Sequence, residues 1–350
     1  MGMTGEEQPA VDVSVVCKGY GLSTVRNIQS LGGTTREITV RPKYLIETAE
    51  GRHVVRYLSQ ESVDVGNVRD RHLLSDRLAD WGVPVARYLR TIRGASLLSA
   101  NGGYYEVQQW MPGESFVWKS TESLCGLAES LSRLHSCPAQ AGSESFLSSK
   151  REDHPDRMLV CCQELIGVAG SRSRRKELER IKRLLLEVQC GLDGGLYTRL
   201  PHSLIHGDLH PGNVGFRANS VSALYDLDYL SFQARSRDLV DGICFFCADR
   251  VEPFRTDDIR LLTQPFTVRH ERVAVFLHAY QMSGSIDDIE WDTFPFLILS
   301  RWIQIRLRGA RKVPQADRID FVLDRFFEPV EWTLRRGRQF FSDVRRQLTT

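Results

Sequence analysis

A short polar segment near the middle of the chain has the residue types and spacing that phosphoryl transfer requires. The segment His206-Gly207-Asp208-Leu209-His210-Pro211-Gly212-Asn213 reads H-x-D-L-x-x-x-N. In that pattern the Asp receives the proton of an acceptor hydroxyl, and the Asn five residues later binds magnesium. We therefore predict that Asp208 is a catalytic base and Asn213 a metal ligand.

A second carboxylate follows in a matching position. Asp226, in Tyr225-Asp226-Leu227-Asp228, lies thirteen residues beyond Asn213 at the end of a short apolar strand. The charge on a moving phosphoryl group is neutralised by a hard cation, and Mg²⁺ takes oxygen ligands from very few protein groups. Asn213 and Asp226 can supply these ligands, which leaves Asp208 free to orient the acceptor. The three residues predict a kinase that uses ATP and Mg²⁺.

The same residues are also compatible with a structural role or with a different chemistry. Taken singly, each residue is more simply a turn, a cap or a hydrogen-bonded core histidine. His206, Asp208 and His210 also alternate along an extended stretch and would share a face, as the ligands of a metallohydrolase do. Pro211 after the second histidine and the later Asn–Asp pair favour phosphoryl transfer over this alternative.

The composition is that of an ordinary globular protein. The 350 residues are 42% hydrophobic and 26% charged with a net charge of +2, so we expect no nucleic-acid partner. No apolar run reaches the roughly 18 residues that span a bilayer, and the acidic start is unlike a signal peptide, so we expect no membrane partner and a cytoplasmic protein. The eight cysteines are scattered through apolar segments, and Cys244-x-x-Cys247 is best interpreted as buried free thiols.

Residues 1–111 are predicted to form a small, β-rich N-terminal lobe that binds nucleotide. A hairpin is expected from Lys43 to Thr48 and His53 to Leu58, followed by a helix from about Val68 to Asp80. The other predicted elements are a helix from Val11 to Gly21 and strands at Arg26 to Leu31, Glu37 to Val40, Val85 to Ile92, Ser96 to Ser99 and Tyr104 to Trp110.

Two parts of this lobe are candidates for nucleotide contacts. Arg56, on the second hairpin strand, stands where a cation is expected to reach the α- and β-phosphates. The following helix contains no Glu to hold that cation, and Asp70 is the nearest acid. The apolar strand that runs into Pro112-Gly113 is predicted to present its edge to adenine, through Gln108, Gln109, Trp110 and Met111.

Residues 112–350 are predicted to form a larger helical lobe for catalysis and substrate binding. Leucines recur at helical spacing from Leu124 to Leu134, and Leu239 to Cys247 is apolar enough to be a buried helix. Asp238 at its start is expected to brace the catalytic segment. Further helices are predicted at Met158 to Val168, from Ser171 through Val188, and at Asp257 to Leu262, Val268 to Gln281, Trp291 to Leu307, Arg318 to Phe327 and Trp332 to Gln347.

With these features the chain resembles the aminoglycoside phosphotransferase/choline kinase family, and its short hairpin is also similar to that of the homoserine kinase built on the same fold. The resemblance rests on the hairpin with Arg56 and on the segments Val83-Pro84-Val85, Gln109-Trp110-Met111-Pro112-Gly113-Glu114, Leu131-Ser132-Arg133-Leu134-His135, His206 to Asn213 and Leu224 to Leu239. It implies an α+β, bilobal protein-kinase-like fold. It also implies Asp208 as base, Asn213 and Asp226 as magnesium ligands, and Arg56 as phosphate contact.

Two departures from the family pattern keep a third function open. Arg replaces Lys at position 56, and the Glu of the first long helix is missing, so a regulatory pseudokinase that binds nucleotide without turnover is an alternative.

The acceptor is expected to be a hydroxyl of a small molecule. Asp226 is followed within twelve residues by Asp238 and a buried helix, which leaves no room for the activation segment of a protein kinase. An acidic cluster, Asp287, Asp288, Glu290 and Asp292, would attract an amino-bearing acceptor if it faced the site, with Trp291 or Trp302 adding a cation–π contact. A helix entry enriched in acids accounts for the cluster more simply. Candidate acceptors are aminoglycosides, choline-like compounds, amino acids and sugars.

Overall fold

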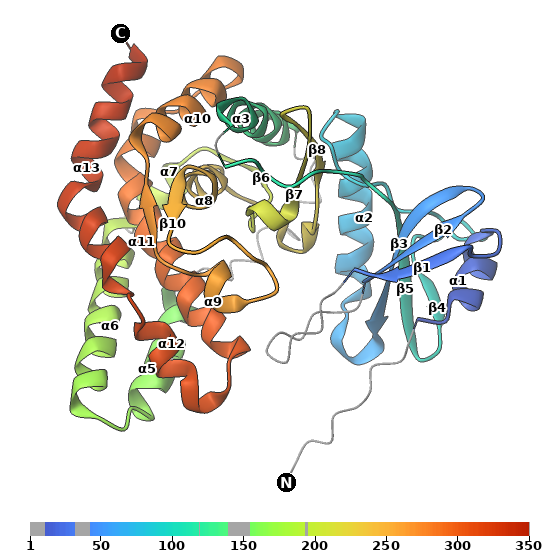
Figure 1. Cartoon of the computed structure of the whole chain (residues 1–350), viewed down its shortest axis with the longest axis horizontal. Helices are drawn as coiled ribbons and strands as arrows, with labels where there is room; N and C mark the ends of the chain where they lie inside the picture. The colour runs from blue at the N-terminus through green and yellow to red at the C-terminus, as the bar shows by residue number, and fades with distance from the viewer. Residues whose placement is uncertain (1–10, 32–42, 119, 139–154, 193–194, 350) are drawn as a thin grey trace. The chain divides into compact units, whose positions relative to one another are not determined.

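The computed structural model describes residues 11–31, 43–118, 120–138, 155–192 and 195–349. The predicted strand Glu37 to Val40 lies outside the described residues. The chain divides into two compact units, one made of residues 1–34, 40–79 and 85–111 and the other of residues 35–39, 80–84 and 112–350 (Figure 1).

The first unit is a five-stranded antiparallel sheet with two helices. The strand order is β1-β2-β3-β5-β4. The strands are β1 (Asn27–Ser30), β2 (Lys43–Thr48), β3 (Gly51–Ser59), β4 (Leu98–Ala100) and β5 (Gly103–Gln109), and the helices are α1 (Val13–Tyr20) and α2 (Val65–Asp80). The predicted hairpin and both helices are confirmed. The predicted strand Val85 to Ile92 is wrong, because this stretch pairs with β5 only through the isolated bridge between Tyr88 and Gln108.

Alternating side chains of the sheet build the core of this unit. Val16 and Tyr20 of α1 pack with Ile46 of β2, Val55 of β3 and Val107 of β5, and all five are buried. Side chains on a strand alternate between faces. The neighbours of Val55 and Val107, which are Arg56 on β3 and Glu106 on β5, therefore lie on the opposite face of the sheet. In that register Arg56 lies directly opposite Glu106.

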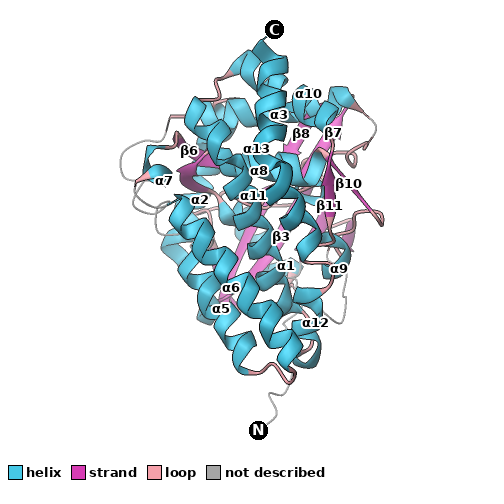
Figure 2. Cartoon of the chain, turned by 90° about the vertical axis from the view of Figure 1, so that its left-hand side faces the viewer, coloured by secondary structure: helices cyan, strands magenta, loops and turns pink. Residues whose placement is uncertain are grey.

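The second unit is mainly helical, as predicted. Its long helix α11 (Asp288–Gly309) is buried along most of its length and packs against other helices, as Figure 2 shows for α5, α6 and α13. The other described helices of this unit are α3 (Thr121–Ser136), α5 (Pro155–Gly167), α6 (Arg172–Leu192), α7 (Leu196–Arg199), α8 (Ser236–Phe246), α9 (Ile259–Leu262), α10 (His270–Ser283), α12 (Arg318–Leu323) and α13 (Phe327–Thr349). None of the described helices is both long enough and apolar enough to cross a bilayer.

Two short ribbons in the second unit hold the predicted catalytic segment. β6 (His202–Ile205) pairs with β9 (Ser231–Ala234), and β7 (Val214–Arg217) pairs with β8 (Ser220–Leu224). The β7–β8 hairpin turns through Ala218 and Asn219, both with positive φ, as a tight two-residue hairpin turn requires. A third ribbon joins β10 (Ala248–Arg250) to β11 (Phe266–Val268). Cys244 and Cys247 are buried free thiols at the end of α8, as expected.

Candidate active site

The β7–β8 hairpin brings Asn213 and the start of Asp226 together. Val214 lies opposite Leu224 in the hairpin register, and the pairing continues one residue further, where the backbone amide of Tyr225 donates to the carbonyl of Asn213 at 2.8 Å. Asp226, the next residue, therefore leaves the hairpin beside Asn213. The two predicted metal ligands thus come from the two ends of one short hairpin.

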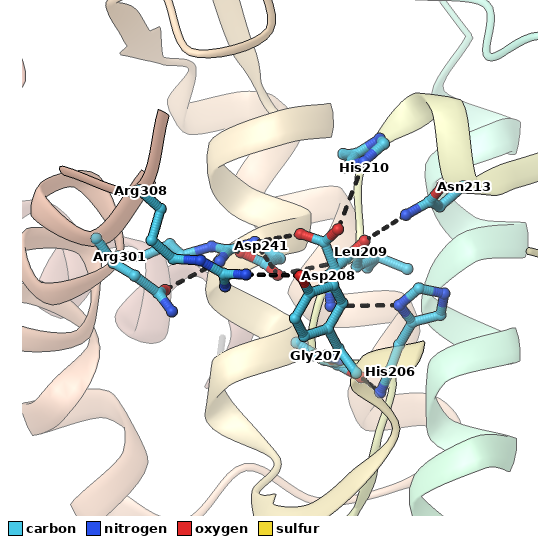
Figure 3. Close-up of polar contacts among 12 residues, drawn as sticks. His206, Gly207, Asp208, Leu209, His210, Asn213, Asp241, Arg301 and Arg308 are labelled. Carbon is cyan, nitrogen blue, oxygen red and sulfur yellow. Dashed lines mark hydrogen bonds and ion pairs between the residues drawn. The ribbon is translucent and has the colours of Figure 1, made fainter. Parts of the chain in front are cut away.

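Asn213 also reaches the third predicted residue. Its side-chain amide nitrogen donates to the backbone carbonyl of Asp208 at 2.9 Å (Figure 3). The donor is fixed by this bond and the side chain is buried, so the amide oxygen is turned to the other side. Asp226 has φ 57° and ψ 64°, a left-handed conformation that is costly for most residues and that Asp tolerates. Oxygen donors on an amide and a carboxylate fit the preferences of a hard divalent cation.

His206 makes structural hydrogen bonds at the start of the predicted catalytic segment, residues 206–213, which is called the loop below. Its Nδ1 accepts from the backbone amide of Asp208 at 3.3 Å, so Nε2 carries the proton and donates to the carbonyl of Tyr225 at 2.8 Å. His210 likewise uses Nδ1 to accept from the amide of Gly212 at 3.1 Å. These bonds commit histidine nitrogens that the metallohydrolase alternative needs. Within the described residues, no cluster of three or more His, Cys, Asp or Glu side chains is arranged to hold a metal.

Asp238 braces the loop, as the sequence predicts. The fully buried carboxylate accepts from the amides of His206 at 2.7 Å and Gly207 at 2.9 Å, and it contacts Nε2 of His135 at 3.3 Å. Burial alone would raise the pKa of Asp238, but His135 and the loop amides hold it below its ordinary value. The carboxylate is therefore charged at neutral pH and ties the loop to α8 and α3.

The carboxylate of Asp208 is partly accessible and has two different neighbours. Its Oδ1 accepts from the guanidinium of Arg301 at 3.2 Å, and its Oδ2 lies 3.8 Å from Nε2 of His210 (Figure 3). Burial would raise the pKa of Asp208, but the charge that His210 carries when protonated and the charge of Arg301 outweigh it and lower the pKa. Burial lowers the pKa of His210 to about 4, so this imidazole is neutral at pH 7. Asp208 is therefore a carboxylate and can accept a proton or a hydrogen bond.

Sequence reasoning missed Arg301 and Asp241. Arg301 lies on α11, 93 residues beyond Asp208, and pairs with Asp241 of α8. The sequence signal for this pair is weak: Arg301 is one of three arginines in α11 and stands in an apolar stretch of it, where a buried charge needs a partner.

In the first unit, Glu106 supplies the acid that the helix lacks. Nε of Arg56 contacts Oε1 of Glu106 at 2.5 Å, and the other carboxylate oxygen lies 3.3 Å from Arg71 and 2.9 Å from His72. Asp70, the nearest acid of the helix, lies on an exposed part of α2, whereas Glu106 faces Arg56 across the sheet. Burial would raise the pKa of Glu106, but Arg56, His72 and Arg71 together bring it to about 2.

The predicted adenine-contacting stretch is partly committed to the sheet. The backbone amide of Gln109 donates to the carbonyl of Arg87 at 2.9 Å, and that of Trp110 donates to the carbonyl of Arg52 at 3.0 Å. Gln108 pairs with Val54 and bridges to Tyr88, and Met111 ends the first unit. Any contact of this stretch with a base must therefore use groups other than those two amides.

Three acids of the cluster at the start of α11 make structural contacts. Asp287 and Glu290 form a capping box at the start of the helix, and Glu290 also accepts from Arg235 at 2.7 Å and Ser236 at 2.8 Å. Asp288 pairs with Arg345. Trp302 is buried and donates to the carbonyl of Phe326 at 2.8 Å. The simpler interpretation, an acidic helix entry, accounts for the contacts of these acids.

Comparison with known proteins places the chain among phosphotransferases. A model of the phosphotransferase enzyme family matches residues 39–272. A homoserine kinase of Zymomonas mobilis is 32% identical over 254 residues, which are 71% of this chain and 76% of that protein.

Two solved structures, of a kinase and of a phosphotransferase, share the fold. Amicoumacin kinase hAmiN, in complex with AMP-PNP, Ca²⁺ and Ami, has a TM-score of 0.65 at 15% identity, covering 91% of this chain and 92% of the other. Spectinomycin phosphotransferase APH(9)-Ia, in complex with ADP and spectinomycin, has a TM-score of 0.63 at 13% identity and covers 93% and 97%. The predicted protein-kinase-like fold is confirmed.

Proposed function

The chain belongs to the phosphotransferase enzyme family and is a small-molecule kinase; from this premise we propose that it transfers the γ-phosphoryl group of ATP to a hydroxyl, with Mg²⁺ as cofactor. In this proposal Asp208 is the base, and Asn213 and Asp226 hold the metal. The backbone bond between Tyr225 and Asn213 carries the proposal, because it makes neighbours of the two ligand positions.

The proposed roles follow from the chemistry of each group. Bound Mg²⁺ would neutralise charge on the phosphate oxygens. Asn213 offers an amide oxygen while its nitrogen holds the Asp208 carbonyl, so the ligand and the base are kept in a fixed relationship. Asp208, kept ionised by its neighbours, orients the acceptor hydroxyl and receives its proton. Little basicity is needed, because phosphoryl transfer depends chiefly on positioning and on charge stabilisation.

Nucleotide binding in the first unit is proposed for Arg56 and the stretch Gln108, Gln109, Trp110 and Met111. Glu106 pairs with Arg56 as a Glu of the helix would. The missing helix Glu is therefore no longer a reason to favour a pseudokinase. The guanidinium of Arg56 keeps its charge in this pair and has the fork geometry that suits phosphate oxygens. AMP-PNP and ADP in the two solved relatives support ATP as the donor.

For the acceptor, we propose a small amino-acid alcohol of the homoserine type. The support is the 32% identity to a homoserine kinase over most of both chains. Three acids of the cluster, Asp287, Asp288 and Glu290, are engaged in the capping box or with arginines, so the cluster does not help to choose among amino-bearing acceptors.

The test is ADP release by the purified full chain with ATP, with and without MgCl₂. The acceptors are homoserine, serine, choline, ethanolamine, spectinomycin and a sugar. Turnover that requires both magnesium and one acceptor class supports the proposal, and homoserine is expected to give the highest kcat/KM. Tight nucleotide binding with no turnover on any acceptor would instead favour the pseudokinase.

A further inference from the structure

Arg301 joins the predicted base to a second buried acid. Its Nε donates to Oδ1 of Asp241 at 2.6 Å, and one terminal nitrogen donates both to Oδ2 of Asp241 at 3.0 Å and to Oδ1 of Asp208 at 3.2 Å. The other terminal nitrogen donates to Gln304 at 3.0 Å. A planar guanidinium bound along one edge to a carboxylate has little freedom to rotate. The terminal nitrogen of Arg301 that donates to Asp208 therefore has a fixed position.

Asp241 anchors this arrangement to the loop itself. Its Oδ2 also accepts from the backbone amide of Leu209 at 3.2 Å. Arg301 is 7% exposed and Asp241 is 3% exposed, so water competes weakly for either group. Helix α11, helix α8 and the loop are thus held together by one ion pair that touches the base.

The contact distinguishes the two oxygens of Asp208. Arg301 occupies Oδ1, whereas Oδ2 faces the neutral ring of His210 at a distance of 3.8 Å, beyond a hydrogen bond. The carboxylate has only one bond from Arg301, so its rotamer depends on that bond and on the loop. Oδ2 is the oxygen left for an acceptor hydroxyl.

We propose that Arg301 is a positioning residue, which holds Oδ1 of Asp208 so that Oδ2 is presented to the acceptor hydroxyl, and that Asp241 keeps its guanidinium aligned. The proposal rests on the proposed phosphoryl transfer, in which Asp208 acts on the acceptor. Misplacement of a reacting group by about 1 Å can cost on the order of 10²-fold in rate. Loss of the fork should therefore reduce kcat far more than it changes the KM for ATP.

The experiment separates positioning from simple charge compensation. Arg301→Gln alone leaves the Asp241 carboxylate buried and unpaired, so the variant is expected to be unstable. In the double variant Arg301→Gln/Asp241→Asn the pair is neutral, and the Tm is expected to recover. If Arg301 only compensates Asp241, the kcat recovers too. If it positions Asp208, the kcat of the stable double variant stays about 10- to 100-fold below wild type, with the KM for ATP within about threefold.

A matched pair on the same two elements provides the control. Arg235, at the start of α8, contacts buried Glu290 of α11 and makes no contact with the loop among the bonds described. The double variant Arg235→Gln/Glu290→Gln should keep wild-type kcat. Arg301→Lys, which keeps a cation for Asp241 but cannot fork to both acids, should be stable and slow.

The outcomes are distinguishable. A folded Arg301→Gln/Asp241→Asn or Arg301→Lys variant with at least half of the wild-type kcat overturns the positioning role. A drop in kcat confined to these variants, with the Arg235/Glu290 control active, supports it. Wild-type protein that transfers no phosphoryl group to any acceptor would overturn the proposed function instead, and with it the reaction that Arg301 is inferred to serve.

Discussion

The backbone carbonyl of Tyr229 lies 2.6 Å from the place that a Cβ atom on Gly207 would occupy. Gly207 precedes Asp208 and has φ 78°, a conformation that costs other residues roughly 1–2 kcal/mol. The loop thus depends on glycine twice, for its backbone angle and for its close approach to a neighbouring backbone.

Gly207→Ala should destabilise the protein by more than the left-handed conformation alone costs, because the Tyr229 carbonyl must also move. Loss of activity should accompany it, since the displacement reaches Asp208. The control is Gly102→Ala, at φ 71° with no atom within 4 Å of the added Cβ. Urea denaturation of both variants measures the difference. Equal losses in the two would show that the close contact is unimportant.

Asp208→Ala should abolish transfer, because the variant has no group to receive the hydroxyl proton, while ATP affinity changes by no more than a few-fold. The measurements are ADP release and a nucleotide-binding titration on the same preparation. Asp249→Asn, in an exposed pair with Arg269, is the control and should keep full activity. Near-normal turnover by the Asp208 variant would remove the base from the mechanism.

Asn213→Ala should raise the magnesium concentration needed for half-maximal rate by at least about tenfold, because one proposed ligand is lost and its bond to the Asp208 carbonyl disappears. Asp226→Asn should do the same through loss of charge. A magnesium titration at saturating ATP measures both. An unchanged titration with either variant would assign the metal to other residues.

Glu106→Gln should cost about 3–5 kcal/mol of folding free energy, because it removes a buried carboxylate that two buried guanidiniums contact. The exposed pair Arg325–Glu328 offers the comparison, and Glu328→Gln should cost no more than about 1 kcal/mol. Chemical denaturation at pH 7 gives both values. A loss at Glu106 as small as that at Glu328 would mean that the buried cluster contributes little.

The same cluster predicts loss of stability in acid. Glu106 has a folded pKa of about 2 against an ordinary 4.5, so its contribution is complete above pH 4.5 and is lost as the pH falls towards 2. Burial lowers the pKa of His72 below its ordinary 6.5, so the unfolded chain binds that proton first and stability also declines below about pH 6.5. Denaturation midpoints between about pH 7 and 3 test this. Glu106→Gln should lack the lower component of the decline.

The extent to which sequence predicted the site follows from distance along the chain. Asp208, Asn213 and Asp226 belong to one continuous run of strand, loop and hairpin, so their proximity follows from local pairing and turn chemistry. Glu106 and Arg301 reach their partners through tertiary packing. Their only local mark is a charge inside an apolar strand or helix, which signals a partner without identifying it.

The sequence leaves the partner of Arg56 open for the same reason. The family pattern places the acid on the helix, whereas the partner of Arg56 is set by sheet register, which requires knowing that β3 and β5 are neighbours. The order of strands is a property of the fold, and one-dimensional patterns do not contain it.

In protein kinases, activity is often switched by swinging the first long helix and so breaking the salt bridge it makes with the strand lysine. Here the acid that holds Arg56 belongs to the sheet, and α2 contributes Arg71 and His72 to the far side of the same carboxylate. A shift of α2 would leave Arg56 and Glu106 joined. If Arg56 contacts phosphate as proposed, movement of α2 alone would therefore not separate it from its acid.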